Sequence, residues 1–411
     1  MDQLSYLLAF ISSLFVIGCL LTPLAARLGA PFLLLFLCIG MLMGEDGIGG
    51  VHFDSFDLAY EIGAVALALI LFSGGFDTKR DTLRRAAAPA FVLSIAGVVL
   101  TTLFAGVLVH FLFGPPLADS LLLGAVIGST DAAATFLLLR QRNTRLKNGL
   151  GEMLIVEAGI NDPMAIFLTI TMVAIVDQNL PVDLATFVSF LPELALQLGL
   201  GLLGGLIGGI VIAALINRVK MPVGLFAPFA MVSALLLFNL ITIAGGSGFL
   251  AVYVAGVILR HRMRHQTERV SQFHDGLSWI SQIVLFLMLG LLVTPRDLLA
   301  QIPLGLGVAA VLIFIARPLA TFLCLTPFGI PFRQQLFVGW VGLKGAVPIF
   351  LAIIPVISPG PVTAGFFDVV FVVVVASLIL QGWTISPAAR ILGLNDISEE
   401  EAELPLSQGK D

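Results

Sequence analysis

The chain has 411 residues, of which 58% are hydrophobic and 11% are charged, and its formal net charge is −5. A soluble domain carries about 25% charged residues, so the composition excludes an ordinary soluble protein and indicates a polytopic membrane protein. We therefore expect most of the chain to contact membrane lipid, and we expect neither an enzymatic activity nor a nucleic-acid partner.

Thirteen apolar segments follow one another along the chain and predict an all-α fold of about 13 transmembrane helices. The second and ninth segments are short for a hydrocarbon core of about 30 Å, so we expect them to be tilted or broken. The segments are 4–26, 30–44, 58–75, 87–113, 117–139, 148–176, 190–216, 222–243, 246–260, 277–293, 303–324, 333–354 and 362–389.

The basic residues predict the orientation of these helices. With the N-terminus outside, 18 of the 21 Lys and Arg residues fall in inside loops or in the C-terminal tail. Only Arg296 falls outside, whereas Arg317 and Lys344 lie within apolar segments. The positive-inside rule therefore predicts an odd number of helices, an external N-terminus and a cytoplasmic C-terminus.

An internal repeat divides the chain into two halves. Thr78–Leu83 is similar to Thr294–Leu299 at an offset of 216, and Gly128–Phe136 faces Gly342–Phe350 at an offset of 214. These matches predict two six-helix halves, joined by the seventh segment and therefore opposite in topology. Inverted repeats with interrupted helices are typical of secondary transporters.

Two segments are interrupted by glycine and charged residues. The fifth breaks at Gly128-Ser129-Thr130-Asp131, and the twelfth breaks at Gly342-Leu343-Lys344-Gly345. Bare backbone cannot face lipid, so we expect both breaks to line a cavity and to bring half-helix ends together. Lys344 and Asp131 could then serve as the cation and the anion that these half-helix ends require, or both could be only structural neutralisers. Thr130 offers oxygen atoms to a hard cation.

The sixth segment carries four polar or helix-breaking residues in an apolar run, namely Glu157, Asn161, Asp162 and Pro163. A carboxylate at mid-membrane costs at least roughly 2.5–3.5 kcal/mol, so each one needs a partner or a function. Glu157 and Asn161 share a helix face, whereas Asp162 lies about 140° around the helix from Glu157. We expect Arg317 to pair with Glu157 as a structural ion pair, which leaves Asp162 as the titratable group beside a proline kink.

Together these motifs resemble the monovalent cation/proton antiporters and are most similar to the bacterial potassium/proton antiporter branch linked to cell-volume regulation. The resemblance covers nearly all of residues 1–390. It implies that Asp162 is the shared cation/proton carboxylate and that Asp131 and Thr130 complete a monovalent-cation site. Asn161 and Ser73 are the further candidates for this site. Glu157, Arg317 and Lys344 are expected to support it, and the protein is expected to need no cofactor besides the transported ions.

The family's fold also implies a domain organisation. Residues 1–86 and 177–302 are expected to form a dimerisation domain, residues 87–176 and 303–390 a moving core domain, and residues 391–411 a short cytoplasmic tail. The protein is then a homodimer in the bacterial inner membrane. Related proteins often carry a cytoplasmic regulatory domain, which we expect to be missing from this chain.

Three departures from sodium-selective relatives bear on the transported ion. Ser73 stands where those proteins often have an acidic residue, Ala158 where they often have serine, and Lys344 where arginine is common. The first two departures leave fewer oxygen ligands, which favours potassium over sodium.

The resulting hypothesis is an antiporter in which Asp162 binds either a proton or a monovalent cation, with electroneutral exchange expected. Two alternatives stay open at this point. A cation channel or uniporter could use the same aspartate without proton coupling, and a proton-coupled solute transporter could use it for protons alone. The broken-helix repeat argues against the channel, as does the lack of a carbonyl-ring filter sequence.

The seventh segment presents a face of small residues that includes Gly201, Gly205 and Gly209. Such faces allow close helix packing in membranes. They predict either close packing inside the fold or a contact between the subunits of a dimer.

Overall fold

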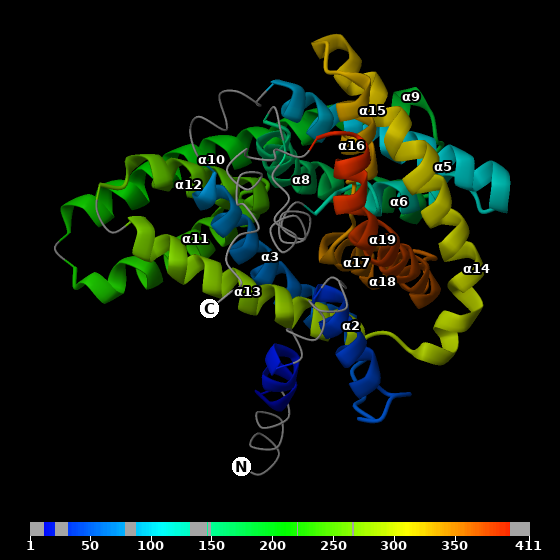
Figure 1. The fold of residues 1–411 in the computed structure, drawn as a ribbon, viewed down its shortest axis with the longest axis horizontal. Coiled ribbons are helices and arrows are strands. Elements are labelled where there is room, and N and C mark those ends of the chain that lie inside the picture. The colour runs from blue at the N-terminus through cyan, green and yellow to red at the C-terminus, as the bar shows by residue number, and fades with distance from the viewer. Residues whose placement is uncertain are drawn as a thin grey trace, which may run out of the picture.

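The computed structural model describes residues 12–20, 32–78, 88–131, 146, 149–219, 221–264 and 267–394, and the secondary-structure elements within these ranges are helices (Figure 1). The α-helices are α2 (Phe32–Met43), α3 (Phe56–Asp77), α5 (Val98–Phe113), α6 (Leu117–Val126), α8 (Leu150–Asp177), α9 (Leu184–Ser189), α10 (Leu191–Arg218), α11 (Phe226–Ile243), α12 (Gly248–Arg262), α13 (Thr267–Leu291), α14 (Pro295–Val311), α15 (Arg317–Leu325), α16 (Phe332–Trp340), α17 (Ala346–Leu351), α18 (Ile353–Ile357) and α19 (Ala364–Ile391).

The described part of the chain contains eight helical stretches that are long and apolar enough to cross a membrane. Three shorter apolar helices accompany them, at Leu33–Met43, Leu117–Val126 and Ala346–Ile357. The expected all-α polytopic fold is therefore confirmed. The count of thirteen stays a prediction, because parts of the first, second and fifth segments lie outside the described residues.

The structure corrects the start of two predicted segments. The tenth was expected from residue 277, but α13 begins at Thr267, and the eleventh was expected from residue 303, but α14 begins at Pro295. The first turns of α13 are mixed in polarity and bury only one face, so they did not register as an apolar run. A proline fits the first turn of a helix, where its missing N–H costs no hydrogen bond. The helix α13 therefore extends the tenth predicted segment by ten residues, which is about three turns.

The predicted repeat is visible in the order of the elements. The helices α8 and α19 both contain 28 residues and begin 214 positions apart. A π-helical turn precedes α5 at Leu93–Gly97, and a second one precedes α15 at Leu312–Ala316. A break also follows α6 in the first half, and another follows α16 in the second half.

Glycines allow two equivalent crossings of the helices. A Cβ atom at Gly40 in α2 would lie 2.9 Å from the Cα atom of Gly290 in α13. A Cβ atom at Gly256 in α12 would lie 2.4 Å from the backbone oxygen of Phe72 in α3. Each short helix thus packs backbone to backbone against a long helix of the other half, and each crossing tolerates no side chain at the contact.

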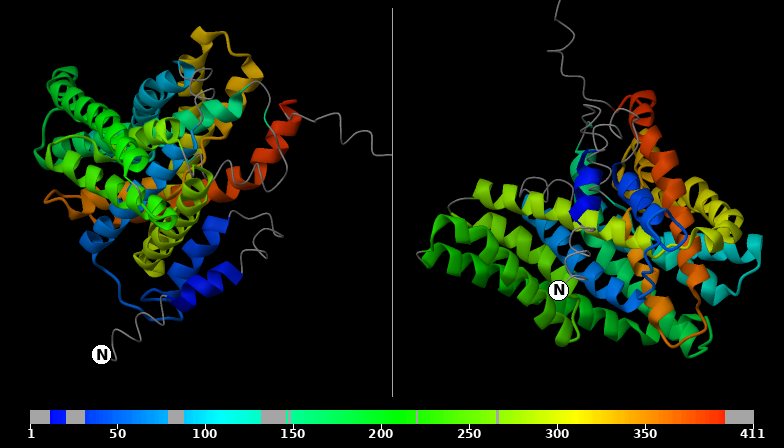
Figure 2. Two further views of the ribbon diagram at one scale, coloured as in Figure 1. Left: turned by 90° about the vertical axis from the view of Figure 1, so that its left-hand side faces the viewer. Right: turned by 90° about the horizontal axis from the view of Figure 1, so that it is seen from below.

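The helices gather on two sides of a central pair. Figure 1 shows α10, α11 and α12 on one side and α5, α14 and α15 on the other, with α3 and α8 between them. Both views in Figure 2 show the long helices of residues 191–262 lying together. In this group the small-residue face of α10 contacts α12, because Gly201, Gly205 and Gly209 lie against Leu250, Val254 and Ile258. That face therefore packs inside the fold.

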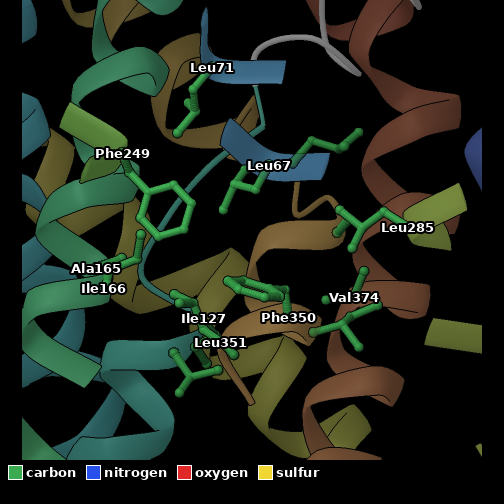
Figure 3. Packing of buried hydrophobic residues seen from close by; sticks show 14 of the residues in the cluster. Leu67, Leu71, Ile127, Ala165, Ile166, Phe249, Leu285, Phe350, Leu351 and Val374 are labelled. Carbon is green, nitrogen blue, oxygen red and sulfur yellow. The ribbon is translucent and has the colours of Figure 1, made fainter. Parts of the chain in front are cut away.

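The centre of the molecule is filled by apolar side chains from both halves. Figure 3 shows Leu67 of α3 between Phe249 of α12 and Leu285 of α13, with Phe350 of α17 next to them. The ring centroids of Phe249 and Phe350 are 6.5 Å apart in an edge-on arrangement. This packing forms an apolar surround for the polar groups on α8 and at the two breaks.

Candidate functional site

The two breaks meet in the interior, as the sequence predicts. The first follows α6 at Ile127, and the second separates α16 from α17. The backbone N–H of Asp131 donates to the carbonyl oxygen of Leu343 at 2.8 Å. Unpaired backbone groups are costly away from water, and this bond satisfies one group from each unwound stretch.

Lys344 connects the two breaks through its side chain, which is 1% exposed. Its ammonium group donates to the carbonyl oxygen of Ser129 at 2.7 Å and to that of Gly128 at 3.4 Å. These carbonyls follow the C-terminal end of α6, where the helix dipole is negative. The geometry supports the structural reading of Lys344, since its charge is directed at a helix end.

Asp131 occupies the corresponding position at the start of α17. A Cβ atom at Gly345 would lie 1.8 Å from the Oδ2 atom of Asp131, so only glycine fits beside this carboxylate. The side chain of Asp131 is half-buried, in contrast to that of Lys344. Asp131 therefore keeps access to the space beside the break.

A buried polar cluster links α8 to the first break and to α15. Arg317 donates to Glu157 at 2.5 Å, and both side chains are 1% exposed. Asn161 Nδ2 donates to the hydroxyl of Thr130 at 2.6 Å, and that hydroxyl donates to Glu157 Oε1 at 3.4 Å. The Ser94 hydroxyl adds a bond to the backbone oxygen of Glu157 at 2.9 Å. The Glu157–Arg317 contact expected from the sequence is thus present, within a wider network.

Asp162 lies on a different side of α8 and faces a cavity of about 300 Å³. The side chain is 6% exposed, and its Oδ1 atom has no hydrogen-bond partner within the described ranges. The helix continues unbroken through Pro163, from Leu150 to Asp177. A buried carboxylate oxygen without a donor is costly unless a proton or a cation joins it.

The cavity collects some of the predicted site residues and excludes others. Ser73, Thr130, Asp131 and Asp162 line it, together with Ala158. Four predicted residues are absent from its lining and belong to the buried contacts behind it, namely Asn161, Glu157, Arg317 and Lys344. The set predicted from sequence therefore separates into a group facing the cavity and a group holding the helices together.

Sequence reasoning missed the far end of this cavity. Asp77, the last residue of α3, and Asp275 in α13 also line it. The Ser271 hydroxyl donates to Asp77 at 2.8 Å. The lining thus holds four carboxylates and, within the described part of the chain, no basic side chain. Their positions at the ends of apolar segments made them look like ordinary boundary residues.

The structure also shows a brace behind the second break that the sequence did not reveal. The backbone N–H of Lys344 donates to the hydroxyl of Ser377 at 3.0 Å, and that hydroxyl donates to Gln381 Oε1. Gln381 Nε2 in turn donates to the backbone oxygen of Trp340 at 2.6 Å. Two turns of α19 thereby fix both ends of the unwound stretch between α16 and α17.

The opposite half of α3 carries two aromatic contacts. The rings of Phe56 and Phe367 are 5.4 Å apart and edge-on, and those of Tyr60 and Phe350 are stacked at 5.2 Å. Both pairs join α3 to helices of the second half, α17 and α19. Along α3, the two aromatic contacts therefore lie toward the Phe56 end, and the cavity that Asp162 lines lies toward the Asp77 end.

Comparison with known proteins identifies related chains across nearly the whole length. The sequence pattern of the family described as sodium/hydrogen exchanger, transmembrane, matches residues 11–391. The K(+)/H(+) antiporter NhaP of Alkalimonas amylolytica is 41% identical over 414 residues, covering 100% of this chain and 70% of the relative. NhaP2 of Shewanella oneidensis, also named a K(+)/H(+) antiporter, is 42% identical over 392 residues, covering 93% of this chain and 67% of the relative.

The fold is also similar to a solved structure, that of the sodium proton antiporter MjNhaP1 from Methanocaldococcus jannaschii at pH 8. The TM-score is 0.75 at 24% sequence identity, and the match covers 92% of this chain and 99% of the other. At this identity the comparison bears on the fold alone, and it agrees with the arrangement of helices described above.

Proposed function

Because the chain belongs to the sodium/hydrogen exchanger family, we propose that it is a secondary antiporter that exchanges protons for monovalent cations, with potassium favoured over sodium. Relatives more than 40% identical carry the name K(+)/H(+) antiporter, which supports the choice of ions. The observation that carries the proposal is the carboxylate of Asp162, buried at the cavity wall with one oxygen lacking a hydrogen-bond partner among the described residues.

The cation site consists of the oxygen atoms that face the cavity. Asp162 supplies the charge, and Asp131, Thr130 and Ser73 supply further oxygen ligands of the kind that hard cations prefer. Asn161 acts indirectly by holding the Thr130 hydroxyl in place. The Glu157–Arg317 pair supplies no oxygen to the ion and fixes α8 against α15, while Glu157 also accepts a hydrogen bond from the Thr130 hydroxyl.

Coupling follows from competition at Asp162. A carboxylate with a bound proton has no charge to offer a cation, and a bound cation stabilises the deprotonated form and so disfavours the proton. Exchange results if the loaded site can change sides and the empty, charged site cannot. One proton leaves for each monovalent cation that binds, so the exchange is electroneutral.

The two sides of the membrane are assigned by the distribution of basic residues. It places the Asp77 end of α3 and the start of α13 on the cytoplasmic side. The cavity then opens inward, and the aromatic pairs at Phe56 and Tyr60 close the outer side. Alternating access requires α8, which carries Asp162, and its core domain to move against α3 and α13. The movement must close the cavity on the cytoplasmic side and open it on the outer side.

The preference for potassium follows from the composition of the cavity wall. Ser73 and Ala158 both line the cavity, so position 73 lacks the carboxylate, and position 158 lacks the hydroxyl, expected in sodium-selective relatives. A small ion that holds its water tightly needs more protein oxygens than a large one. The site is therefore better suited to potassium, which loses its hydration shell more readily.

The proposal also covers the oligomeric state, the domain organisation and the location of the protein. Residues 1–86 and 177–302 form the interface of a homodimer, residues 87–176 and 303–390 form the moving core, and residues 391–411 form the cytoplasmic tail. The protein resides in the bacterial inner membrane with its N-terminus outside. The layered arrangement of α10, α11 and α12 away from the site supports this division (Figure 1).

Reconstituted protein tests the function directly. Proteoliposomes that contain a pH-sensitive dye should show proton flux on addition of potassium, with smaller responses to sodium and lithium and a response to rubidium close to that of potassium. The Asp162→Asn variant should lose this flux while eluting as a folded protein. Glu152→Gln removes an exposed carboxylate from the first turn of the same helix and should behave like the wild type.

Two outcomes would contradict the proposal. Normal cation-driven proton flux in Asp162→Asn would remove the central carboxylate from the mechanism. Cation movement without stoichiometric proton counterflow in the wild type would instead establish a channel or uniporter.

A further inference from the structure

A second cavity lies at the Phe56 end of α3, opposite the one that Asp162 faces. It has a volume of about 90 Å³, and its wall contains four carboxylates and no basic side chain of the described part of the chain. The carboxylates come from three separate parts of the chain, namely the loop between α2 and α3, the start of α14 and the first turns of α19. They are Glu45, Asp54, Asp297 and Asp368.

Asp368 is the deepest of these carboxylates. It is only 6% exposed, although it belongs to a helix otherwise rich in valine and phenylalanine. It has no hydrogen bond or ion pair with any residue that the structure describes. Burial of an unpaired carboxylate is costly, so the position calls for a positive partner from solution.

The nearby basic side chains of the described residues contact Asp46 and Glu45, of which only Glu45 lines the cavity. Arg296 contacts Asp46 at 3.3 Å, and its backbone N–H donates to the same carboxylate. His52 contacts Glu45 at 3.2 Å. Among the described residues, no basic side chain therefore forms an ion pair with Asp54, Asp297 or Asp368.

The second cavity lies on the same boundary as the first one. Phe56 and Phe367, whose rings are in contact, both line it. One turn further along α3, Tyr60 stacks on Phe350, and beyond that Leu67 and Leu71 line the cavity of Asp162. A single helix thus carries, in order, an acidic cavity, two aromatic contacts and a second acidic cavity.

We propose that this outer cavity is a second cation site, which holds a hydrated monovalent cation at the outer mouth of the pathway to Asp162. The proposal rests on the antiport function above, since it gives the cation a route past the aromatic contacts when they open. The ion keeps its water because no group of three or more acidic, histidine or cysteine side chains in the described ranges is placed to hold a metal ion directly.

The role of such a site is to raise the cation concentration at the closed outer gate. Clefts lined by charge of one sign concentrate counter-ions and accelerate their capture. Asp368 belongs to the part of the chain proposed to move, whereas Glu45, Asp54 and Asp297 belong to the part proposed to stay. Opening of the gate would therefore separate the carboxylates and release the ion toward Asp162.

Membrane vesicles of defined sidedness test the proposal with the full chain. Potassium is added to the outer face in right-side-out vesicles and to the cytoplasmic face in everted vesicles, and proton flux is recorded in both. Asp368→Asn should raise the half-saturating potassium concentration about three- to tenfold at the outer face only. This fold-change is expected when one negative charge is removed at roughly 10 Å from the cation. It assumes an effective dielectric constant of about 20 and screening by salt. The maximal rate should be kept.

Matched variants separate this effect from a general disturbance. Asp57→Asn removes an exposed charge from the first turn of α3 that does not line the cavity, and it should change nothing. Asp368→Glu keeps the charge and should retain the wild-type outer affinity. If Asp368→Asn does not reach the membrane, the double variant Asp54→Asn/Asp297→Asn replaces it. This variant changes two exposed carboxylates of the same wall and should also raise the half-saturating potassium concentration at the outer face.

The outcomes also distinguish this proposal from the function itself. An unchanged outer half-saturating concentration in both charge-removing variants, or an equal rise at both faces, would overturn the outer site and leave the antiport intact. Absence of cation-driven proton flux in the wild type would overturn the antiport itself.

Discussion

The helices α8 and α19 hold equivalent places in the two halves, yet they present different chemistry to the breaks beside them. Glu157, Asn161 and Asp162 on α8 correspond, at the offset of 214, to Phe371, Val375 and Ala376 on α19. The α8 copy thus carries both carboxylates, one paired and one facing the cavity. The α19 copy instead holds its break with neutral groups, through Ser377 and Gln381.

This difference shows how a repeated scaffold can produce an asymmetric site. Both halves contain a π-helical turn, a break and a long helix, so the repeat accounts for the backbone. The charge distribution does not repeat, since Thr130 in the first break corresponds to Lys344 in the second. A cation site needs an excess of negative charge. Two breaks that carried equal and opposite charges would leave no such excess. In the proposed mechanism, Asp162 of the α8 half therefore provides the exchange site, and the second break is held by neutral groups of α19.

The largest loss of folding stability should come from removing the charge of Glu157 from the polar network on α8. Glu157→Gln leaves the Arg317 guanidinium buried without a counter-charge, which costs about 3–5 kcal/mol of folding stability. The variant should lose most of its thermal stability in detergent or fail to accumulate. Thermal unfolding monitored by size-exclusion chromatography measures this loss. The corresponding residue of α19, Phe371, has no charge, and Phe371→Leu should cost no more than an ordinary core substitution.

A double variant sharpens the same test. Glu157→Leu/Arg317→Met replaces both charges by apolar groups and should recover much of the stability, since no buried charge is left unpaired. A Glu157→Gln protein with normal stability and altered ion selectivity would show that Glu157 belongs to the ion site rather than to the support.

The next largest loss of stability should come from adding a side chain where α3 crosses α12. Gly75→Ala would place a Cβ atom 2.2 Å from the backbone oxygen of Tyr253, whereas Gly74→Ala meets nothing within 4 Å. Because the clash is with backbone, we expect Gly75→Ala to cost about 3 kcal/mol, at the upper end for overpacked positions. Gly74→Ala should be neutral or slightly stabilising, since alanine favours a helix over glycine. Equal melting temperatures for the two variants would argue against the close crossing of α3 and α12.

The residues whose buried contacts were expected from the sequence have patterns that stand out against a lipid-facing chain. Glu157, Arg317 and the glycine-flanked Lys344 are charges inside apolar runs, and burial forces each to find a partner. The order of the helices follows from hydropathy and the repeat for the same reason. These features depend on local composition, which a sequence displays directly.

The missed features depend on which elements meet in space. Ser377 and Gln381 are neutral and four residues apart, a pattern that many buried helices show without any function. Asp77 and Asp275 are 198 positions apart and become neighbours of one cavity only through the crossing of α3, α12 and α13. The early start of α13 was hidden because its first turns bury one face only. None of these relations has a signature in the local sequence.

The brace on α19 predicts a smaller effect than the α8 network. Gln381→Leu leaves the backbone oxygen of Trp340 and the hydroxyl of Ser377 without their partner, at a cost of about 1–3 kcal/mol for unsatisfied buried groups. Because Lys344 is displaced with the break, the half-saturating cation concentration should rise while the stability loss remains below that of Glu157→Gln. Thermal unfolding and transport assays on the same preparation compare the two. A Gln381→Leu protein that is as unstable as Glu157→Gln would contradict the division into a charged and a neutral half.

The smallest change expected is a shift in ion preference. Ser73 on α3 lines the cavity with Asp162, and its counterpart on α13 at the offset of 216 is the buried Leu289. Ser73→Asp adds a carboxylate to the wall of the cavity, and additional oxygen ligands favour the ion that is harder to dehydrate. The ratio of half-saturating sodium to potassium concentrations should fall about two- to fivefold, which corresponds to less than 1 kcal/mol. Ser73→Ala, which removes an oxygen, should move the ratio in the opposite direction. If neither substitution changes the ratio, the bound ion is held from the α8 side alone, and α3 serves only as the wall against which the site moves.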